Sequence, residues 1–128
     1  MKSQFVKLLT LVCMLGIWGT ASAEFRAVWI CTIGDGKTMD DVRTANSKWV
    51  KFVNDNVDGG GISSHILTPV FGDVTAGRFI YSDAFPTMAS WSAARASMQD
   101  SEEGEAIDAE LNEVAECSEH HLYEAEKS

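Results

Sequence analysis

Two apolar segments along the chain have the composition of buried strands. Residues 26–33 (RAVWICTI) form a nearly continuous apolar run that contains Val, Trp, Ile and Thr. Such a run is typical of a strand covered on both faces, as in a parallel sheet. Residues 62–71 (ISSHILTPVF) predict a second strand, and Pro69 favours its termination or an edge position there.

Between these segments, residues 38–57 repeat their apolar side chains at the spacing of a helix. Thr38 followed by Asp41 resembles a capping box, with Asp in the place usually taken by Glu or Gln. The three glycines at 59–61 follow the last apolar position and are expected to end the helix.

The second half of the chain predicts a long loop and two helices. Residues 72–88 read as a loop, within which residues 78–81 have the composition of a short strand. Residues 89–99 predict a short helix, and residues 101–126 a long one with a narrow apolar stripe. The order strand, helix, strand, loop, helix predicts an α/β fold built as a partial βαβα unit with an acidic C-terminal helix.

The first 23 residues have the pattern of a secretory signal peptide. Lys2 and Lys7 precede an apolar stretch at 8–18 that is too short to span a bilayer, and Ala-Ser-Ala at 21–23 is typical of a cleavage site. We therefore expect a secreted or periplasmic protein that begins at Glu24 and has no transmembrane segment after cleavage.

Charge divides the remaining chain into two parts. The whole sequence has a net charge of −9, which becomes −11 once Lys2 and Lys7 are removed with the signal peptide. The acids concentrate in residues 100–126, which contain no Lys or Arg, so we place a boundary between a region at 24–99 and an acidic helix at 100–128. An acidic surface disfavours nucleic acid and anionic lipid as partners.

Two cysteines, Cys31 and Cys117, remain after signal cleavage. In an oxidising compartment they could pair and close a long loop, which would stabilise the fold by ~4–5 kcal/mol in the chain-entropy model. The alternative, two buried free thiols, stays open because sequence alone does not give the distance between them.

The apolar run at 26–33 resembles the first strand of a secreted bacterial glycoside-hydrolase-like family, related to family 10 glycoside hydrolases, which begins Arg-Ala-Val-Trp-(Ile/Leu)-Ala-Thr. Cys31 replaces the family's Ala. The segment at 68–73 is similar to the family's Val-Arg-Pro-x-Gly-Asp, although Thr68 stands in place of Arg. Weaker similarity follows at Tyr81-Ser82, Pro86 and Trp91-Ser92.

This resemblance implies the first third of a TIM barrel, cut short by the length of the chain. It further implies a family role in carbohydrate hydrolysis, although two strands cannot enclose a catalytic site and the chain is not expected to be competent alone. Carbohydrate is then the expected ligand, with self-association or a complementing barrel chain to cover the open sheet. The alternative is a small secreted or periplasmic binding or interaction protein without catalysis.

Five side chains are candidates for the site of such a protein. Asp35 and Asp73 each follow a predicted strand, where a barrel places its active site, and glycoside hydrolysis needs two carboxylates. The competing interpretation is ordinary turn chemistry. Tyr81, Phe85 and Trp91 could stack on sugar rings, or could simply pack over the open end of the sheet.

Other residues are better explained by structure than by chemistry. Glu116, His120 and Glu124 share one face of the predicted C-terminal helix, but this spacing is more typical of a solvated acidic face than of a metal site. Trp29 and Trp49 are expected in the core. No motif indicates a metal or another cofactor.

Overall fold

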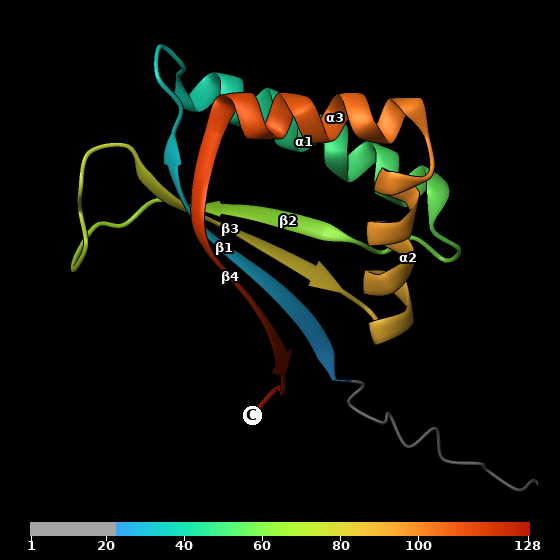
Figure 1. Cartoon of the computed structure of the whole chain (residues 1–128). Coiled ribbons are helices and arrows are strands. Elements are labelled where there is room, and N and C mark those ends of the chain that lie inside the picture. The colour runs from blue at the N-terminus through green and yellow to red at the C-terminus, as the bar shows by residue number, and fades with distance from the viewer. Residues whose placement is uncertain (1–22) are drawn as a thin grey trace, which may run out of the picture.

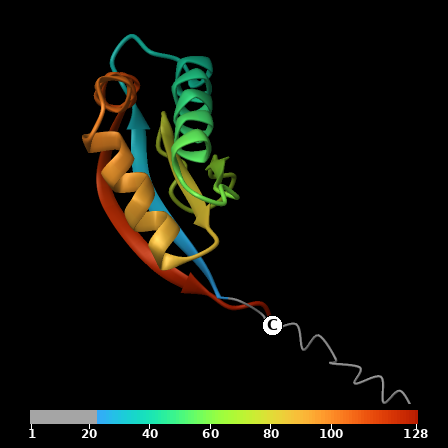
Figure 2. The same cartoon turned by 90° about the vertical axis from the view of Figure 1, so that its right-hand side faces the viewer.

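The computed structural model describes residues 23–128, which form one antiparallel sheet of four strands with three helices on one of its faces (Figure 1, Figure 2). The expected signal peptide lies almost entirely outside the described residues. The elements in chain order are β1 (Glu24–Ile33), α1 (Met39–Asn56), β2 (Ser63–Leu67), β3 (Arg78–Phe85), α2 (Met88–Gln99), α3 (Glu102–Val114) and β4 (Ala115–Ala125).

The strands lie side by side in the order β2-β3-β1-β4, and every neighbouring pair is antiparallel. As a result β1 and β2, which α1 connects, run in the same direction with β3 inserted between them. In the same way β3 and β4 run in the same direction on either side of β1. The chain therefore consists of two interleaved crossover units, each of which places its helices on the same face of the sheet.

This topology shows that the predicted partial βαβα unit of a TIM barrel is wrong. A barrel requires adjacent parallel strands, whereas no two adjacent strands of the described residues are parallel. The error arises from β3, because its residues lie in the segment 72–88 that predicts a long loop, within which only residues 78–81 have the composition of a short strand. Without β3, the two strands flanking α1 are naturally taken as neighbours.

The first helix forms as the sequence predicts. Thr38 is the N-cap of α1, its hydroxyl accepts a hydrogen bond from the backbone N–H of Asp41, and the Asp41 carboxylate accepts one from the backbone N–H of Thr38. These bonds satisfy two of the free backbone donors of the first turn. In the last turn of α1, Asn54 donates through Nδ2 to the backbone carbonyl of Ile62 and accepts through Oδ1 from its backbone N–H, which fixes the turn into β2.

The predicted acidic helix over 101–126 is only half correct. Its first part is α3, where Ile107, Leu111 and Val114 keep the helical stripe, but residues 115–125 form the edge strand β4. The pairing of β4 with β1 shifts by one residue at Ser118, which forms a bulge. Because a bulge breaks the two-residue alternation of a strand, the sequence of β4 shows no clear strand pattern.

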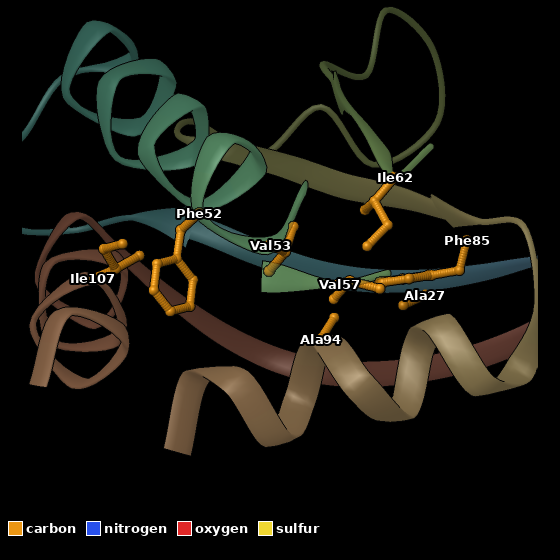
Figure 3. Close-up of a cluster of buried hydrophobic side chains, with 8 residues drawn as sticks. All are labelled: Ala27, Phe52, Val53, Val57, Ile62, Phe85, Ala94 and Ile107. Carbon is orange, nitrogen blue, oxygen red and sulfur yellow. The ribbon is translucent and has the colours of Figure 1, made fainter. Parts of the chain in front are cut away.

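The core lies between the covered face of the sheet and the three helices. Figure 3 shows side chains of one cluster converging from the sheet and the three helices: Ala27 from β1, Phe85 from β3, Ala94 from α2, Ile107 from α3, Phe52 and Val53 from α1, and Val57 from the C-cap of α1. A second cluster surrounds Phe79 and Cys31, which are fully buried. Burial of this apolar surface is what holds the helices against the sheet.

Cys31 and Cys117 form a disulfide, so the pairing that the sequence left open is present. The two residues lie directly opposite each other on β1 and β4. The bond therefore ties the edge strand to the centre of the sheet. Within residues 23–128 no helix is long and apolar enough to cross a membrane.

Candidate functional site

A cavity of about 740 Å³ lies between the sheet and the helices. Its volume is in the range of small-molecule sites. The sheet forms the floor, α2 and α3 form the opposite wall, and Trp49 of α1 contributes to one side. The lining residues that matter for its chemistry are Ala27, Trp29, Trp49, Tyr81, Asp83, Phe85, Trp91, Arg95, Glu105, Asp108 and His120.

Strand register sets the order of side chains on the floor. Tyr81 on β3 is the cross-strand partner of Trp29 on β1, and Trp29 is in turn the partner of His120 on β4. The rings of Trp29 and His120 stack with centroids 3.5 Å apart and planes 8° from parallel. These three side chains therefore form one row across the sheet, with the indole in the middle.

The next row leaves open space. Here Asp83 on β3 is opposite Ala27 on β1. Only glycine has a smaller side chain than Ala27, and glycine in the interior of a strand would weaken the strand. Around this gap stand Trp49 and Phe85, whose rings meet edge to face at 6.3 Å. Large aromatic walls around a small floor residue explain why the cavity is not filled by the chain itself.

Two polar atoms in the site have no partner. The hydroxyl of Tyr81 and Nε2 of His120 are buried, and neither is hydrogen-bonded to another described residue. Tyr81 is only 6% exposed. Because a buried polar group without a partner costs about 1–3 kcal/mol, such groups are rare in proteins. Both residues line the cavity, so the two unpartnered groups lie beside it.

Asp83 is a buried carboxylate beside this row, and its side chain is part of a short hydrogen-bonded chain. Ser64 donates to its Oδ1 at 2.5 Å, and Asn46 donates to the Ser64 oxygen at 3.0 Å. Asp83 is 6% exposed and makes no ion pair with a described residue. Burial raises the pKa of Asp83 to about 6, against the opposing effect of the Ser64 hydrogen bond. The group can therefore exchange a proton close to neutral pH.

Arg95 of α2 is the positive charge of the cavity. Its guanidinium lies over the ring of Trp91, 5.2 Å from the centroid, and it forms no ion pair within residues 23–128. Burial and, after it, the charge of Arg95 lower the pKa of His120, which keeps the imidazole neutral at neutral pH. Glu105 and Asp108 also line the cavity, from α3.

The structure brings together three of the five residues that the sequence suggested. Tyr81 and Phe85 project from β3 and Trp91 from α2, and all three line the cavity. Asp35 and Asp73 do not line it. Asp35 lies in an exposed turn after β1. Asp73 lies in the exposed loop before β3, where its Oδ2 is 3.3 Å from Nε of Arg78.

The hydrogen bonds that Asp73 accepts from Thr75 lower the pKa of its carboxyl, which suits a turn residue better than an acid catalyst. A catalytic role for Asp35 and Asp73 stays an untested prediction. The parallel barrel from which it was argued is not present.

Sequence reasoning missed Asp83 and His120, and it assigned Trp29 and Trp49 to the core alone. Asp83 lies in a segment whose sequence predicts a loop, and His120 lies in one whose sequence predicts an exposed helix face. Two-residue spacing of Tyr81, Asp83 and Phe85 was the available signal, because it places all three on one face of a strand. Among the described residues no group of three or more His, Cys, Asp or Glu side chains is placed to hold a metal ion.

Together, the βαββαβ order, the strand order and the helix-covered face define a ferredoxin-like fold. SnoaB, a cofactor-independent oxygenase from Streptomyces nogalater, has this fold with a TM-score of 0.61 at 13% identity, over 83% of this chain and 96% of SnoaB. A protein of unknown function from Bacteroides thetaiotaomicron, described as a possible oxidoreductase, has a TM-score of 0.54 at 8% identity, over 82% and 100% of the two chains. A dimeric ferredoxin-like protein from Thermobifida fusca has a TM-score of 0.48, too low to add to the assignment.

No protein-family model and no curated protein matches the sequence. The antiparallel sheet and the structures that share it show that the resemblance of residues 26–33 to a glycoside-hydrolase-like family is wrong, and so is a truncated glycoside hydrolase as the function. SnoaB and the Bacteroides thetaiotaomicron protein match the antiparallel fold of this chain over 96% and 100% of their own lengths, whereas a glycoside hydrolase of that family is a barrel. A run such as RAVWICTI suits any buried central strand, which is the position that β1 occupies.

Proposed function

We propose that this protein is a small oxygenase that binds a planar, hydroxylated aromatic molecule in the cavity and oxidises it with molecular oxygen. The observation that carries the proposal is the pair of buried, unpartnered polar atoms, the Tyr81 hydroxyl and His120 Nε2, in a cavity walled by aromatic rings. SnoaB is described as a cofactor-independent oxygenase. At 13% identity this supports only the fold, so the activity is argued from the cavity.

The walls favour a flat aromatic occupant. Trp29, Trp49 and Trp91 present large ring surfaces, and offset or edge-to-face contacts between rings stabilise a bound aromatic molecule beyond simple burial. A hydroxyl on that molecule can hydrogen-bond to Tyr81. Asp83, on the same face two residues further along β3, is placed to accept the hydroxyl proton.

Removal of that proton makes the ring electron-rich, which is the condition for direct reaction with oxygen. In the overall step a hydroxyarene reacts with one O₂ to give a quinone and one water. One oxygen atom becomes the new carbonyl, and the other takes up the hydroxyl hydrogen and the hydrogen of the attacked ring carbon. Oxygen is the only oxidant, and the substrate supplies all four electrons, so no further reductant is needed.

The test uses the purified full chain with 2-naphthol and the larger 2-anthrol. Titration calorimetry is expected to show saturable binding. An oxygen electrode is expected to show consumption of oxygen, accompanied by formation of the quinone. Tyr81→Phe is expected to weaken binding by about tenfold, because it removes a hydrogen bond in a buried site. Asp83→Asn is expected to abolish turnover while binding persists, because it removes the proton acceptor.

Tyr123→Phe on the exposed part of β4 is the matched control and is expected to change neither quantity. Absence of saturable binding of both ligands to the wild-type protein would contradict the proposal. So would oxygen consumption that Asp83→Asn leaves intact.

We also propose that the protein is exported by cleavage of residues 1–23. The signal-peptide pattern supports this, and so does the Cys31–Cys117 disulfide, since disulfides persist mainly in oxidising compartments. Mass spectrometry of the protein recovered outside the cytoplasm is expected to find Glu24 at the N-terminus. An intact Met1 in that fraction would contradict cleavage.

A further inference from the structure

We propose that Ser64 is a positioning residue: its hydroxyl, directed by Asn46, holds Oδ1 of Asp83 and leaves Oδ2 as the atom that accepts the hydroxyl proton of the substrate. This inference rests on the proposed function and adds how the proton acceptor of the site is oriented and kept ionised. It is carried by a chain of hydrogen bonds that joins three elements, α1, β2 and β3.

The distances among the three side chains decide where the Ser64 proton lies. Nδ2 of Asn46 is 3.0 Å from Oγ of Ser64 and donates to it. A serine hydroxyl has only one proton to donate. Its oxygen lies 2.5 Å from Oδ1 of Asp83 but 3.4 Å from Oδ1 of Asn46, so Asp83 receives the proton. Ser64 is therefore a fixed donor to one oxygen of Asp83.

Asn46 and Ser64 are polar side chains at positions where packing alone favours apolar ones. Asn46 is 9% exposed, on the buried face of α1 that also carries Val42 and Val53. Ser64 is the cross-strand partner of Asp83, so both side chains lie on the helix-covered face of the sheet. Within residues 23–128, Asn46 and Ser64 make side-chain hydrogen bonds only to each other and to Asp83. Their cost to the core is therefore tied to that carboxylate.

The second oxygen of Asp83 is left for a ligand. No side chain among the described residues donates to Oδ2, and Asp83 lines the cavity. Ser64 approaches from β2, whereas the open space lies above Ala27 on β1. In the proposed reaction the O–H bond of the substrate breaks and an Oδ2–H bond forms. Asp83 then gives this proton to the oxygen atom that leaves as water.

No charged side chain competes with Ser64 for Asp83. The neighbours from α1, β1 and β2 are uncharged, and the titratable groups that line the cavity on its other sides are Tyr81 on β3, Arg95 on α2, Glu105 and Asp108 on α3, and His120 on β4. None of these groups forms a hydrogen bond or an ion pair with Asp83. Burial raises the pKa of Asp83 to about 6, and the hydrogen bond from Ser64 opposes this rise.

The first test needs no ligand. Carbon-13 NMR of the full chain, labelled at the side-chain carboxyl of Asp, measures the pKa of Asp83, whose signal is assigned by its loss in Asp83→Asn. Ser64→Ala is expected to raise this pKa from about 6 to about 7, because it removes the hydrogen bond that favours the ionised form. Ser64→Thr keeps a hydroxyl and is expected to restore the wild-type pKa. Ser63→Ala, the same substitution on the neighbouring exposed residue of β2, is the matched control and is expected to leave the pKa unchanged.

The second test follows oxygen consumption with 2-naphthol as the pH is varied. Asp83 must be ionised to accept a proton, so the rate rises with pH through its pKa. Relative to its own rate at pH 8.5, the wild type is expected to keep about half at pH 6 and Ser64→Ala about a tenth. At pH 8.5 both proteins are ionised at Asp83, and Ser64→Ala is expected to be about threefold slower because Oδ2 is no longer oriented. Ser64 does not line the cavity, so the affinity for 2-naphthol is expected to stay within about twofold.

The outcomes separate this inference from the proposed function. An unchanged pKa of Asp83 in folded Ser64→Ala, or an equal rise in Ser63→Ala, overturns the inference, and the proposed function stands if the wild type oxidises 2-naphthol. A lower pKa in Asn46→Ala also overturns it, because Asn46 would then draw the Ser64 proton away from Asp83. If the wild type neither binds nor oxidises 2-naphthol, the proposed function fails, and the role of Oδ2 in the reaction fails with it.

Discussion

Asp83 is the residue at which stability and function conflict. A carboxylate that is 6% exposed, and that Ser64 alone hydrogen-bonds through its side chain, is costly to ionise inside the protein. The fold nevertheless places it on the floor of an aromatic cavity beside an unpartnered tyrosine hydroxyl. Ala27 opposite it leaves the space that a ligand needs. Both residues lower the stability that a filled, apolar core would have, which is typical of a site kept for binding.

The cost of Asp83 is expected to appear as a pH-dependent stability. Burial raises its pKa from 3.8 to about 6 in the folded protein. Below about pH 4 the group is protonated in both states; as the pH rises to about 6 the unfolded chain ionises first, so the free energy of unfolding falls. Asp83→Asn should therefore stabilise the protein by on the order of 2–3 kcal/mol near pH 7.5 and very little near pH 4.

Urea denaturation at the two pH values measures this difference. Asp35→Asn, in an exposed turn, is the control and is expected to leave stability unchanged at both. A variant of Asp83 that is destabilised near pH 7.5 would show that the carboxylate has a stabilising partner.

Ala27 tests the cavity itself. Its side chain is 2% exposed and lies on the floor opposite Asp83, so Ala27→Leu should fill the space where a ligand ring would lie. We expect binding of 2-naphthol to weaken by at least about tenfold in calorimetry, while overpacking costs about 1–3 kcal/mol of stability. Ala96→Leu on the exposed face of α2 is the matched control. Unchanged affinity in a folded Ala27→Leu protein would place the ligand elsewhere.

At the scale of the elements, β4 places part of the site at the edge of the sheet. It is an edge strand that pairs with β1 alone, yet it carries His120. Its bulge at Ser118 lets both Cys117 and His120 face the helices, although they are three residues apart. The disulfide compensates for the single pairing by fixing β4 to β1 near the bulge.

Removal of the disulfide is therefore expected to loosen β4 first. The bond closes a loop with a sequence separation of 86, for which the chain-entropy model gives about 4–5 kcal/mol. In a Cys31→Ala/Cys117→Ala protein, hydrogen–deuterium exchange should increase strongly in β4 and much less in β2 and β3. Binding of 2-naphthol should weaken as well, because His120 of β4 lines the cavity.

A reducing agent should produce the same exchange pattern in the wild-type protein and have no effect on the double variant. Equal protection of β4 in the oxidised and reduced proteins would show that strand pairing alone holds it.

At the scale of the whole molecule, the sequence predicted individual elements better than their arrangement. The capped helix from Thr38, the short helix ending at Gln99 and the buried first strand were all recognisable, because each has a regular local pattern. Residues 78–85 and 115–125 were not, since the first follows a glycine-containing loop and the second contains a bulge. These two strands decide the topology, because they flank β1 on both sides. Without them the sequence does not predict the cavity, although it does suggest three of its aromatic residues, Tyr81, Phe85 and Trp91, as ligand contacts.

Removal of residues 115–128 tests whether the C-terminal region is a solvated acidic helix or the edge strand β4. If the C-terminal region were a solvated acidic helix, its loss would leave the rest folded. In the structure that region contains β4, so a chain ending at Val114 loses one side of the sheet, the disulfide and His120, and it exposes the backbone edge of the apolar strand β1. An exposed, apolar strand edge favours aggregation. We expect this truncated chain to aggregate or to show no cooperative unfolding by circular dichroism.

The control is Glu116→Gln/Glu124→Gln in the full chain, which removes two exposed acids but keeps the strand. This protein should unfold cooperatively like the wild type. A soluble, cooperatively folded chain ending at Val114 would contradict the four-stranded architecture.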